Sequence, residues 1–417
     1  MKQPRDESLF SFEITLLMKI LMIAPEPFFE PRGTPFSEYF RIKALSELGH
    51  EVDLATYPLG RNLEIPGLRI FRSLPVPGIS RVKVGPSIGK LFLDFFLFFT
   101  VLKLLFKNRY DCIHTHEEAC FWGAVLCRIW RIPHVYDMHS SLSQQFKNFD
   151  IVHSDWIHRV LQAFEKFALQ SSDAIIAICP YLKNHVVESG VTRKVFVIEN
   201  TPESDGVLPG ERKTEGDVPQ FPGKSVVLYA GTFEHYQGLD LLLESVPFVV
   251  KQRPDVVFLL IGGDAKSIEV QRKICEKLGI ADHVILREKI AAAEVPGYFR
   301  ISDVLVSPRK SGTNTPLKIY SYLRSRKPIV ATNLVTHTQV LTPEISILTE
   351  PGPEAFAAGI LSALQDPSVA QMVERAFQTA EEKYSYREYV FRIAQLYQYI
   401  ENLKTPHLKT ATSEGVV

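Results

Sequence analysis

Short apolar runs alternate with helical segments along this chain, and the alternation occurs twice. The strand-like runs of the first half include KILMIA (19–24), EVDLATY (51–57), DCIHTH (111–116) and HVYDMH (134–139). Those of the second half include SVVLYAG (225–231), VVFLLIGG (256–263), VLVSP (304–308) and IVATN (329–333). Strands that alternate with helices form parallel sheets with right-handed crossovers. The sequence therefore predicts an α/β protein of two consecutive doubly wound parallel-sheet domains.

A segment without periodicity separates the two rounds. The stretch PESDGVLPGERKTEGDVPQFPG (202–223) is rich in proline, glycine and charge, which is typical of a linker. A chain of 417 residues is long enough for two cores. We expect a disordered or mis-assigned leader at 1–17, domains at 18–203 and 224–385, a linker at 204–223, and at 386–417 a tail and a helix that can pack back on the first domain.

The overall charge excludes one class of function. Lys+Arg and Asp+Glu both number 47, and a net charge of zero argues against bulk electrostatic binding of nucleic acid. The five cysteines include no CxxC pair and no zinc-type spacing. They are typical of small buried side chains in a reducing, cytoplasmic compartment.

The longest apolar run is LFLDFFLFFTVLKLLF (91–106). Asp94 and Lys103 interrupt it, and it is shorter than the roughly 20 residues that a membrane-spanning helix needs. Two interpretations stay open: a buried helix of the first domain, or a surface helix that enters the membrane interface.

A phosphate site is predicted in SPRKSGTNTPLKIYSYLRSRKPIVATN (307–333). A strand ends at Pro308, a polar loop follows, and Thr315 is expected to cap a helix that begins at Pro316. Free backbone N–H groups and the helix N-terminus suit a diphosphate. Lys318, one turn into the helix, adds charge, and Arg309 and Lys310 are expected on the approach. The alternative is an ordinary strand-loop-helix junction.

Histidines end two strands of the first half, in IHTHEEA (113–119) and VYDMHSS (135–141). The carboxyl ends of parallel strands are where ligands bind. We expect only one of His114 and His116 to face the ligand, because they alternate along a strand, and we prefer His116 with Glu117. His139 ends the second strand. No helical ligand spacing is present, so no metal is expected. A structural histidine at a strand end is the alternative.

The first strand is followed by PEPFFEPRGTPFSEY (25–39). Gly33 would allow backbone to approach a ligand, Arg32 would supply charge, and Thr34 begins a helix. The alternative is a rigid connection between strand and helix.

The strongest motif resembles a known signature. P-L-K-x-x-x-Y-L-x-S-x-K-P-I-V-A-T (316–332) looks like the donor site of the family 4 retaining glycosyltransferases, which have the GT-B fold of two Rossmann-like domains facing a central cleft. The resemblance covers roughly residues 18–400. Gly231 with Gly238, the pair Gly262-Gly263, and S-D-V-L-V-S-P (302–308) also match.

The resemblance implies roles for individual residues. The first domain would bind the acceptor and the second the nucleotide sugar, with His139 against the transferred sugar and His139, Lys318 and Arg309 as catalytic residues. The donor would contact Gly231, Thr232, Gly262, Gly263, Arg287, Ser311, Gly312, Thr313, Asn314, Thr315, Pro316, Leu317 and Ser321. The acceptor would contact Arg32, Gly33, Thr34, His116 and Glu117.

Four positions depart from the family pattern. Thr313 and Ser321 stand where many relatives have two glutamates, the second of which contacts the donor ribose. Thr232 stands in place of an arginine, and Gln237 in place of a lysine. Charge for a diphosphate must therefore come from Arg309, Lys310 or Lys318, or from backbone dipoles.

The expected function is hexosyl transfer with retained configuration, from a nucleoside diphosphate sugar such as a UDP-sugar to the hydroxyl of a saccharide or lipid-linked acceptor. Such transfer belongs to cell-surface polysaccharide or glycolipid synthesis. We expect a cytoplasmic protein, peripheral at a membrane surface, with no cofactor and no nucleic-acid partner. Two alternatives remain: a nucleotide-sugar epimerase that uses Glu117 and Asp137, and an inactive sugar- or nucleotide-binding protein.

Overall fold

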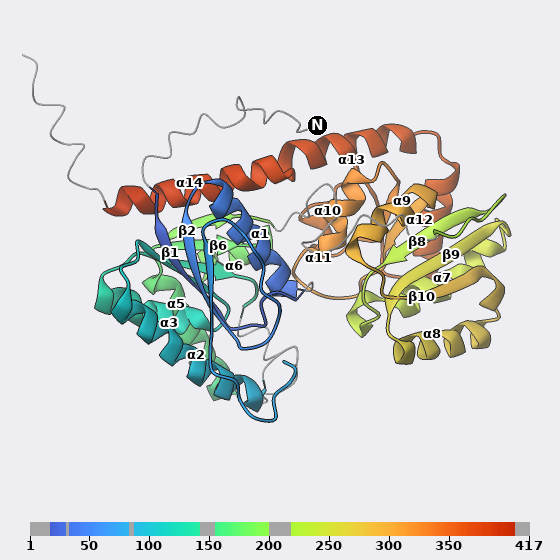
Figure 1. The fold of residues 1–417 in the computed structure, drawn as a ribbon. Coiled ribbons are helices and arrows are strands. Elements are labelled where there is room, and N and C mark those ends of the chain that lie inside the picture. Colours follow the sequence, from blue (N-terminus) through green and yellow to red (C-terminus); the bar gives the residue numbers. More distant parts are fainter. Residues whose placement is uncertain (1–16, 31–32, 83–86, 142–154, 200–217, 405–417) are drawn as a thin grey trace, which may run out of the picture. The chain divides into compact units, whose positions relative to one another are not determined.

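The computed structural model describes residues 17–30, 33–82, 87–141, 155–199 and 218–404 (Figure 1). The chain forms two compact units. Unit 1 comprises Met1–Ile178, Leu182–Ile198 and Val390–Val417, and unit 2 comprises Cys179–Tyr181 and Glu199–Tyr389. Nearly all of the expected leader, and most of the expected linker, lie outside the described residues.

Unit 1 is built on a seven-stranded sheet of order β3-β2-β1-β4-β5-β6-β7, in which every pair of neighbours is parallel. Its strands are β1 (Lys19–Ala24), β2 (Glu51–Thr56), β3 (Leu68–Arg72), β4 (Cys112–His116), β5 (His134–Met138), β6 (Ala174–Ala177) and β7 (Lys194–Val197). Its helices are α1 (Gly33–Glu47), α2 (Ile88–Lys107), α3 (Ala119–Trp130), α5 (Asp155–Ser171), α6 (Pro180–Glu188) and most of α14 (Tyr386–Lys404).

Unit 2 contains a six-stranded parallel sheet of order β10-β9-β8-β11-β12-β13. Its strands are β8 (Ser225–Ala230), β9 (Val256–Gly263), β10 (Val284–Glu288), β11 (Val304–Ser307), β12 (Ile329–Thr332) and β13 (Ile347–Thr349). Its α-helices are α7 (Leu239–Val250), α8 (Ala265–Leu278), α9 (Val295–Ile301), α10 (Leu317–Arg324), α11 (Val335–Thr338), α12 (Pro353–Gln365) and α13 (Val369–Lys383). Two parallel-sheet domains are thus confirmed.

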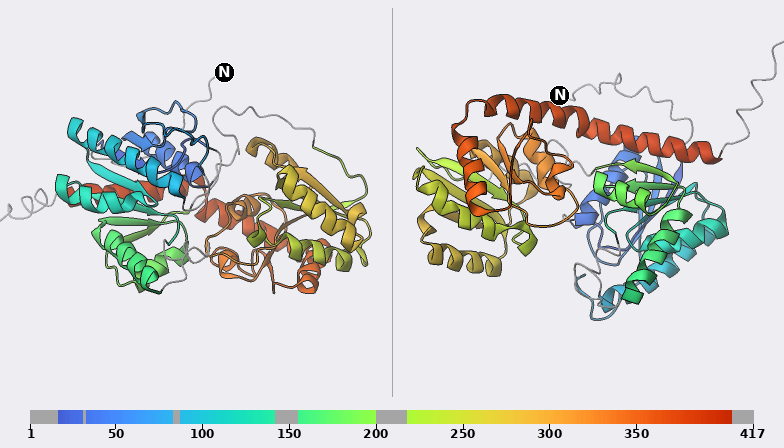
Figure 2. Two further views of the ribbon diagram at one scale, coloured as in Figure 1. Left: turned by 90° about the horizontal axis from the view of Figure 1, so that it is seen from below. Right: turned by 180° about the vertical axis from the view of Figure 1, so that it is seen from behind.

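Alternation along the strands divides the core of unit 2 into two layers. Val227 and Tyr229 of β8 pack with α7 and α12, whereas Val226 and Leu228 pack with α9 and α10. Successive side chains of a strand point to opposite faces, so a strand covered by helices on both faces is apolar throughout. Figure 2 shows helices on both faces of this sheet.

Helix α2 is a core helix on one face and exposes apolar side chains on the other. Leu93, Leu97 and Val101 on one face are buried in the core beside β1 and α3, as a core helix requires. The opposite face is exposed, and Phe92 and Phe95 both keep 56% of their surface accessible. Among the helices of the described residues, none combines the length and the apolar character that crossing a membrane requires.

Two glycines allow the ends of neighbouring strands in unit 2 to approach each other. Gly238, at φ +73°, begins α7, and a Cβ there would lie 1.9 Å from the carbonyl oxygen of Pro308. Gly262, at φ +126°, would place a Cβ 2.1 Å from the carbonyl oxygen of Gly231. A side chain at Gly238 would push the start of α7 away from the end of β11, and one at Gly262 would push β9 away from the residue that follows β8.

We predict that Gly238→Ala destabilises unit 2 by about 3 kcal/mol or more, because it adds a collision with Pro308 to the cost of a left-handed backbone. Gly279→Ala is the matched control in the same unit. Gly279 has φ +67°, and no atom lies within 4 Å of its Cβ position. It should lose only about 1 kcal/mol. Thermal unfolding measures both, and equal losses would contradict the collision.

Candidate active site

The polar loop of unit 2 lies at the carboxyl ends of three adjacent strands. β8 is flanked by β9 and β11 in the sheet, and the segment 308–316 leads from β11 into α10. The backbone N–H of Gly231, just after β8, donates to the carbonyl of Ile261 in β9 at 2.9 Å. Ser311 and Gly312 at the tip of the loop are exposed.

Arg309 lies within the loop rather than on its approach. Its Nη1 donates to the carbonyl oxygen of Asn314 at 2.9 Å and to Oγ1 of Thr336 at 2.8 Å. Its guanidinium also stacks 5.1 Å from the centre of the Tyr236 ring. Arg309 thus fixes the shape of the loop and brings a positive charge beneath it.

Lys310 already has a counter-charge. Its Nζ lies 2.5 Å from Oδ2 of Asp240, and both side chains are about one-third exposed, at 36% and 37%. A cation that is paired and solvated contributes little to the field felt by a ligand. Of the cations expected to hold a diphosphate, Lys310 is therefore the weakest candidate.

Lys318 has a buried ammonium without an acceptor. Its Nζ makes no hydrogen bond to any described residue, and it lies 3.8 Å from the centre of the Tyr229 ring. A Cβ on Gly231 would be only 2.9 Å from this nitrogen. The side chain thus reaches from the first turn of α10 to the end of β8, where its ammonium lies against the π-face of Tyr229.

Burial lowers the pKa of Lys318 well below its usual value, and the charge of Arg309 lowers it further. Neighbouring polar atoms are unsatisfied too: Nε of Arg309 and Oε1 of Gln237 are buried without a described partner. Two unsatisfied donors, one in α10 and one after β11, and an acceptor in the turn before α7 match the needs of an anionic ligand that also offers a donor.

The other donor residues that the sequence predicted do not all gather at this loop. Thr232 lies beside it, and its carbonyl accepts from the Tyr229 hydroxyl at 2.7 Å. The carbonyl of Thr313 accepts from Gln339 at 2.9 Å. Arg287 lies on the edge strand β10, where it donates to the Tyr298 hydroxyl at 2.7 Å. Gly263 ends β9, while Leu317 and Ser321 belong to α10.

The predicted helix cap is wrong by one residue. Pro316, with extended backbone, is the N-cap of α10, and its side chain makes no capping hydrogen bond. α10 begins at Leu317, so Thr315 lies one residue before the cap. Proline fits either position because its fixed φ suits both.

In unit 1 four side chains surround Asp137. His114 Nε2 and His139 Nε2 lie 3.5 and 3.4 Å from its carboxylate oxygens. The rings of His114 and His116 stack at 4.9 Å, and His116 Nδ1 is 3.2 Å from His139 Nε2. The expectation that only one of His114 and His116 faces this side was wrong, because residues i and i+2 of a strand share a face.

Arg41 compensates the charge of Asp137. Its Nε donates to Oδ2 of Asp137 at 2.7 Å, and both side chains are fully buried. Burial would raise the pKa of Asp137, but Arg41 and the histidines outweigh it, so the pKa lies well below its usual range. A carboxylate held in this way is a poor acid or base, so Asp137 is a weak member of the carboxyl pair that the epimerase alternative needs.

The histidines of this cluster are neutral at physiological pH. Burial lowers the pKa of His139 to about 4, although Asp137 opposes the shift. Burial also lowers the pKa values of His114 and His116. The nitrogen and oxygen atoms of His114, His116 and Asp137 lie close enough to hold a metal ion. A divalent ion there would face the guanidinium of Arg41, so we still expect none.

Carboxyl groups with raised pKa values lie on three segments of unit 1: Glu26 after β1, Glu38 in α1 and Glu117 after β4. Burial raises the pKa of Glu38 to about 8 and that of Glu117 to about 7. The pKa of Glu26 is also raised well above its usual value, by burial and by Glu38. Gly33 is the first residue of α1 and Thr34 the second, whereas Arg32 lies outside the described residues.

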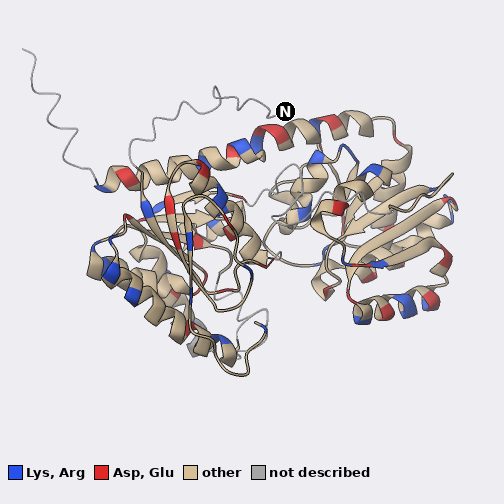
Figure 3. Ribbon diagram, in the orientation of Figure 1, with Lys and Arg blue, Asp and Glu red and all other residues tan. Residues whose placement is uncertain are grey.

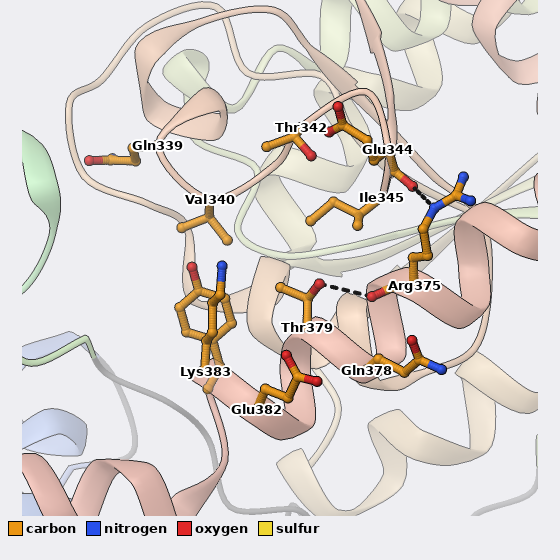
Figure 4. A pocket seen from close by; sticks show the side chains of 11 residues that line it. Gln339, Val340, Thr342, Glu344, Ile345, Arg375, Gln378, Thr379, Glu382 and Lys383 are labelled. Carbon is orange, nitrogen blue, oxygen red and sulfur yellow. Dashed lines mark hydrogen bonds between the residues drawn. The ribbon is translucent and has the colours of Figure 1, made fainter.

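A separate pocket of about 390 Å³ lies on unit 2, between the segment after α11 and the end of α13 (Figure 4). Arg375 Nε donates to the carbonyl of Glu344 at 2.9 Å across its wall. Gln339 lines it and also contacts the polar loop through Thr313. None of the predicted site residues lines this pocket, so we assign it no role.

Sequence analysis missed Arg41 and Tyr229. Arg41 falls on the apolar face of its helix, four residues after Ser37 and four before Leu45, and all three are buried. A charged residue on such a face was the available signal. Tyr229 is an ordinary aromatic in a buried strand, and nothing in the sequence distinguishes it.

Comparison with known proteins identifies the family. Residues 41–202 match the model "Glycosyltransferase Family 4", and residues 224–366 match "Glycosyl transferases group 1". The phosphatidyl-myo-inositol mannosyltransferase of Mycobacterium tuberculosis is 22% identical over 397 residues, which are 91% of this chain and 97% of that protein. The D-inositol 3-phosphate glycosyltransferase of Paenarthrobacter aurescens is 27% identical, over 54% of this chain and 57% of that protein.

Solved structures share the fold. Sucrose-phosphate synthase from Thermosynechococcus elongatus superposes with a TM-score of 0.72 at 19% identity, covering 93% of this chain and 100% of that one. Anabaena HepE in complex with UDP gives 0.68 at 18% identity, with the same coverage. The chain therefore belongs to the family 4, group 1 glycosyltransferases of the GT-B fold, and it is a transferase.

Proposed function

We propose that this enzyme transfers a hexosyl group from a UDP-sugar to a hydroxyl group with retention of anomeric configuration. The buried, unpaired Nζ of Lys318 is the observation that carries the proposal. An ammonium withdrawn from water needs a counter-charge, and a diphosphate against the loop 308–316 supplies one. The UDP and UDP-glucose bound by HepE, a protein of the same fold, support uridine as the base.

The chemistry needs stabilisation of the departing diphosphate. As the anomeric C–O bond breaks, negative charge collects on the phosphate oxygens. Lys318 and Arg309 would meet that charge together with the backbone N–H groups of the exposed loop tip, Ser311 and Gly312. Groups that are already in place when charge develops need no reorganisation, which is how preorganised sites accelerate reactions. We assign Thr232 and Ser321 to hydrogen bonds with the donor.

We assign unit 1 to the acceptor. Neutral His139 would bind the transferred sugar by hydrogen bonds, since burial keeps its imidazole uncharged. Glu117, with a pKa raised to about 7 by burial, can accept from or donate to a hydroxyl group. We place His116, Gly33, Thr34 and Arg32 in the same acceptor site.

We infer a role in cell-surface polysaccharide or glycolipid synthesis, with a saccharide or lipid-linked acceptor. The mycobacterial relative is named for a lipid acceptor, phosphatidyl-myo-inositol. The proposed location is the cytoplasm, at the surface of a membrane, and no metal or other cofactor is part of the proposal.

Lys318→Met should weaken UDP binding on the order of 30-fold, about 2 kcal/mol, because it removes a buried charge to which the described residues offer no acceptor. The same change should preserve or raise thermal stability, since an unpaired buried ammonium is costly. Calorimetric titration with UDP and thermal unfolding measure the two effects. Lys310→Met, which removes an exposed paired cation, should change UDP affinity less than about 3-fold. Equal UDP affinity in the Lys318 variant and the wild type would refute the proposed site.

UDP binding should also weaken as the pH rises from about 7 to 9. The pKa of Lys318 is lowered in the free protein, and a bound diphosphate would raise it, so binding takes up a proton. Affinity then falls by at most about tenfold for each pH unit above the lowered pKa. Titrations of wild type and Lys318→Met across this range compare the slopes. Parallel slopes would show that Lys318 is not the group that takes up the proton.

His139→Ala should leave UDP affinity within about twofold while lowering kcat by about 100-fold or more, because its imidazole is assigned to the sugar and not to the nucleotide. Transfer from labelled UDP-glucose and UDP titration give the two numbers. His185→Ala, which removes a half-buried histidine paired with Glu165 at 2.6 Å, is the control and should retain kcat. Full turnover by the His139 variant would remove this residue from the site.

A further inference from the structure

Helix α2 carries a continuous apolar stripe on its outer surface. Every side chain of the stripe keeps at least half of its surface accessible, and Phe106 keeps 77%. At 100° per residue these positions fall within an arc of about 100° on one side of the helix. We call this stripe the aromatic face; it consists of Ile88, Leu91, Phe92, Phe95, Phe99 and Phe106.

The inner side of α2 fixes the orientation of this face. Leu93, Leu97 and Leu104 are buried in the core of unit 1. The hydroxyl of Tyr57 donates to Asp94 at 2.5 Å, and Lys90 pairs with Glu118 at 2.5 Å. A helix held by its opposite side in this way does not need an apolar outer side in order to fold.

The neighbouring helix α3 extends the exposed apolar surface. Phe98 and Phe106 of α2 meet Trp122 and Trp130 of α3 with ring centres 5.7 and 5.3 Å apart. On α3, Ile129 keeps 63% of its surface accessible. The combined apolar area is on the order of 500 Å², which is large for a protein surface that stays in water.

The charges around this surface are almost all positive. Helices α2 and α3 contain a single acidic residue, Asp94, against several Lys and Arg residues (Figure 3). The Asp94 carboxylate accepts a hydrogen bond from the hydroxyl of Tyr57, whose side chain belongs to the core beside α2. Lys103 and Lys107 flank the aromatic face at the end of α2, and Arg128 lies exposed on α3. Among the described residues none forms an ion pair with Lys103 or Lys107.

We propose that the aromatic face binds the interface of a bilayer that contains anionic lipids. Phenylalanine side chains would enter the boundary between headgroups and acyl chains, while Lys103, Lys107 and Arg128 would contact lipid phosphates. A second copy of the chain fits less well, because a two-fold contact through this stripe would bring like charges together. This inference gives the proposed membrane location a specific surface, and it rests on that location rather than on the donor chemistry.

Vesicle sedimentation tests the surface without any transfer assay. The intact enzyme should sediment with vesicles of phosphatidylglycerol and phosphatidylcholine, and less with phosphatidylcholine alone. The triple variant Phe92→Gln, Phe95→Gln, Phe99→Gln should lose at least about 30-fold in partitioning, because three apolar anchors are removed. Lys103→Gln with Lys107→Gln should lose mainly the preference for phosphatidylglycerol.

Phe248→Gln is the matched control, since Phe248 lies in unit 2 and is 41% exposed. It should bind vesicles like the wild type. UDP affinity, measured on each variant, should be unchanged, which separates failure of this inference from failure of the donor site. Vesicle binding by the triple variant at the level of the wild type would overturn the inference. So would a wild-type dimer, seen by sedimentation velocity, that the same three changes dissociate.

Discussion

A buried ammonium without a counter-charge is the constraint on which the donor site depends. Transferring such a group out of water costs several kcal/mol, and the ring of Tyr229 returns only part of that cost. This burial lowers the pKa of Lys318 in the folded protein. In this reading the site is unfavourable when empty, and its stability improves when a diphosphate enters.

In unit 1, by contrast, the buried charge is already compensated within the protein. Arg41 and Asp137 satisfy each other at 2.7 Å, and the surrounding imidazoles lose their basicity to burial. An ion pair whose charges compensate each other does not require a charged ligand. What remains available around it are neutral donors and acceptors, which suit the hydroxyl groups of a sugar better than a phosphate. The proposed assignment of the charged donor to unit 2 and of the uncharged acceptor to unit 1 agrees with how each unit compensates its buried charge.

The apolar periodicity of the sequence predicted most of the fold. Many contacts of the candidate site could not be predicted, because they join residues far apart in the sequence. The run VVFLLIGG became β9 with the expected bounds, because a fully buried parallel strand has an apolar signature that needs no tertiary information. The pairing of Arg41 with Asp137 joins residues 96 positions apart, so no local pattern could reveal it. The Arg309 side chain lies within the loop because it donates to the hydroxyl of Thr336, a residue of the later helix α11. The prediction that only one of His114 and His116 faces the ligand was wrong for a local reason, because residues i and i+2 of a strand share a face.

Helix α2 shows why a long apolar run cannot be assigned to core or surface from hydropathy. One arc of the helix has the spacing of a core helix, and the opposite arc is also apolar. The mean hydropathy of the run is therefore the same whether the helix is read as a core helix or as a surface helix. Asp94 and Lys90 make their contacts, with Tyr57 and Glu118, on the arc that points inward. Both are charged residues within or beside the run, and each finds its partner on another element. Asp94, which interrupts the apolar run, is therefore also one of the residues that hold the opposite arc inward and leave the phenylalanines exposed.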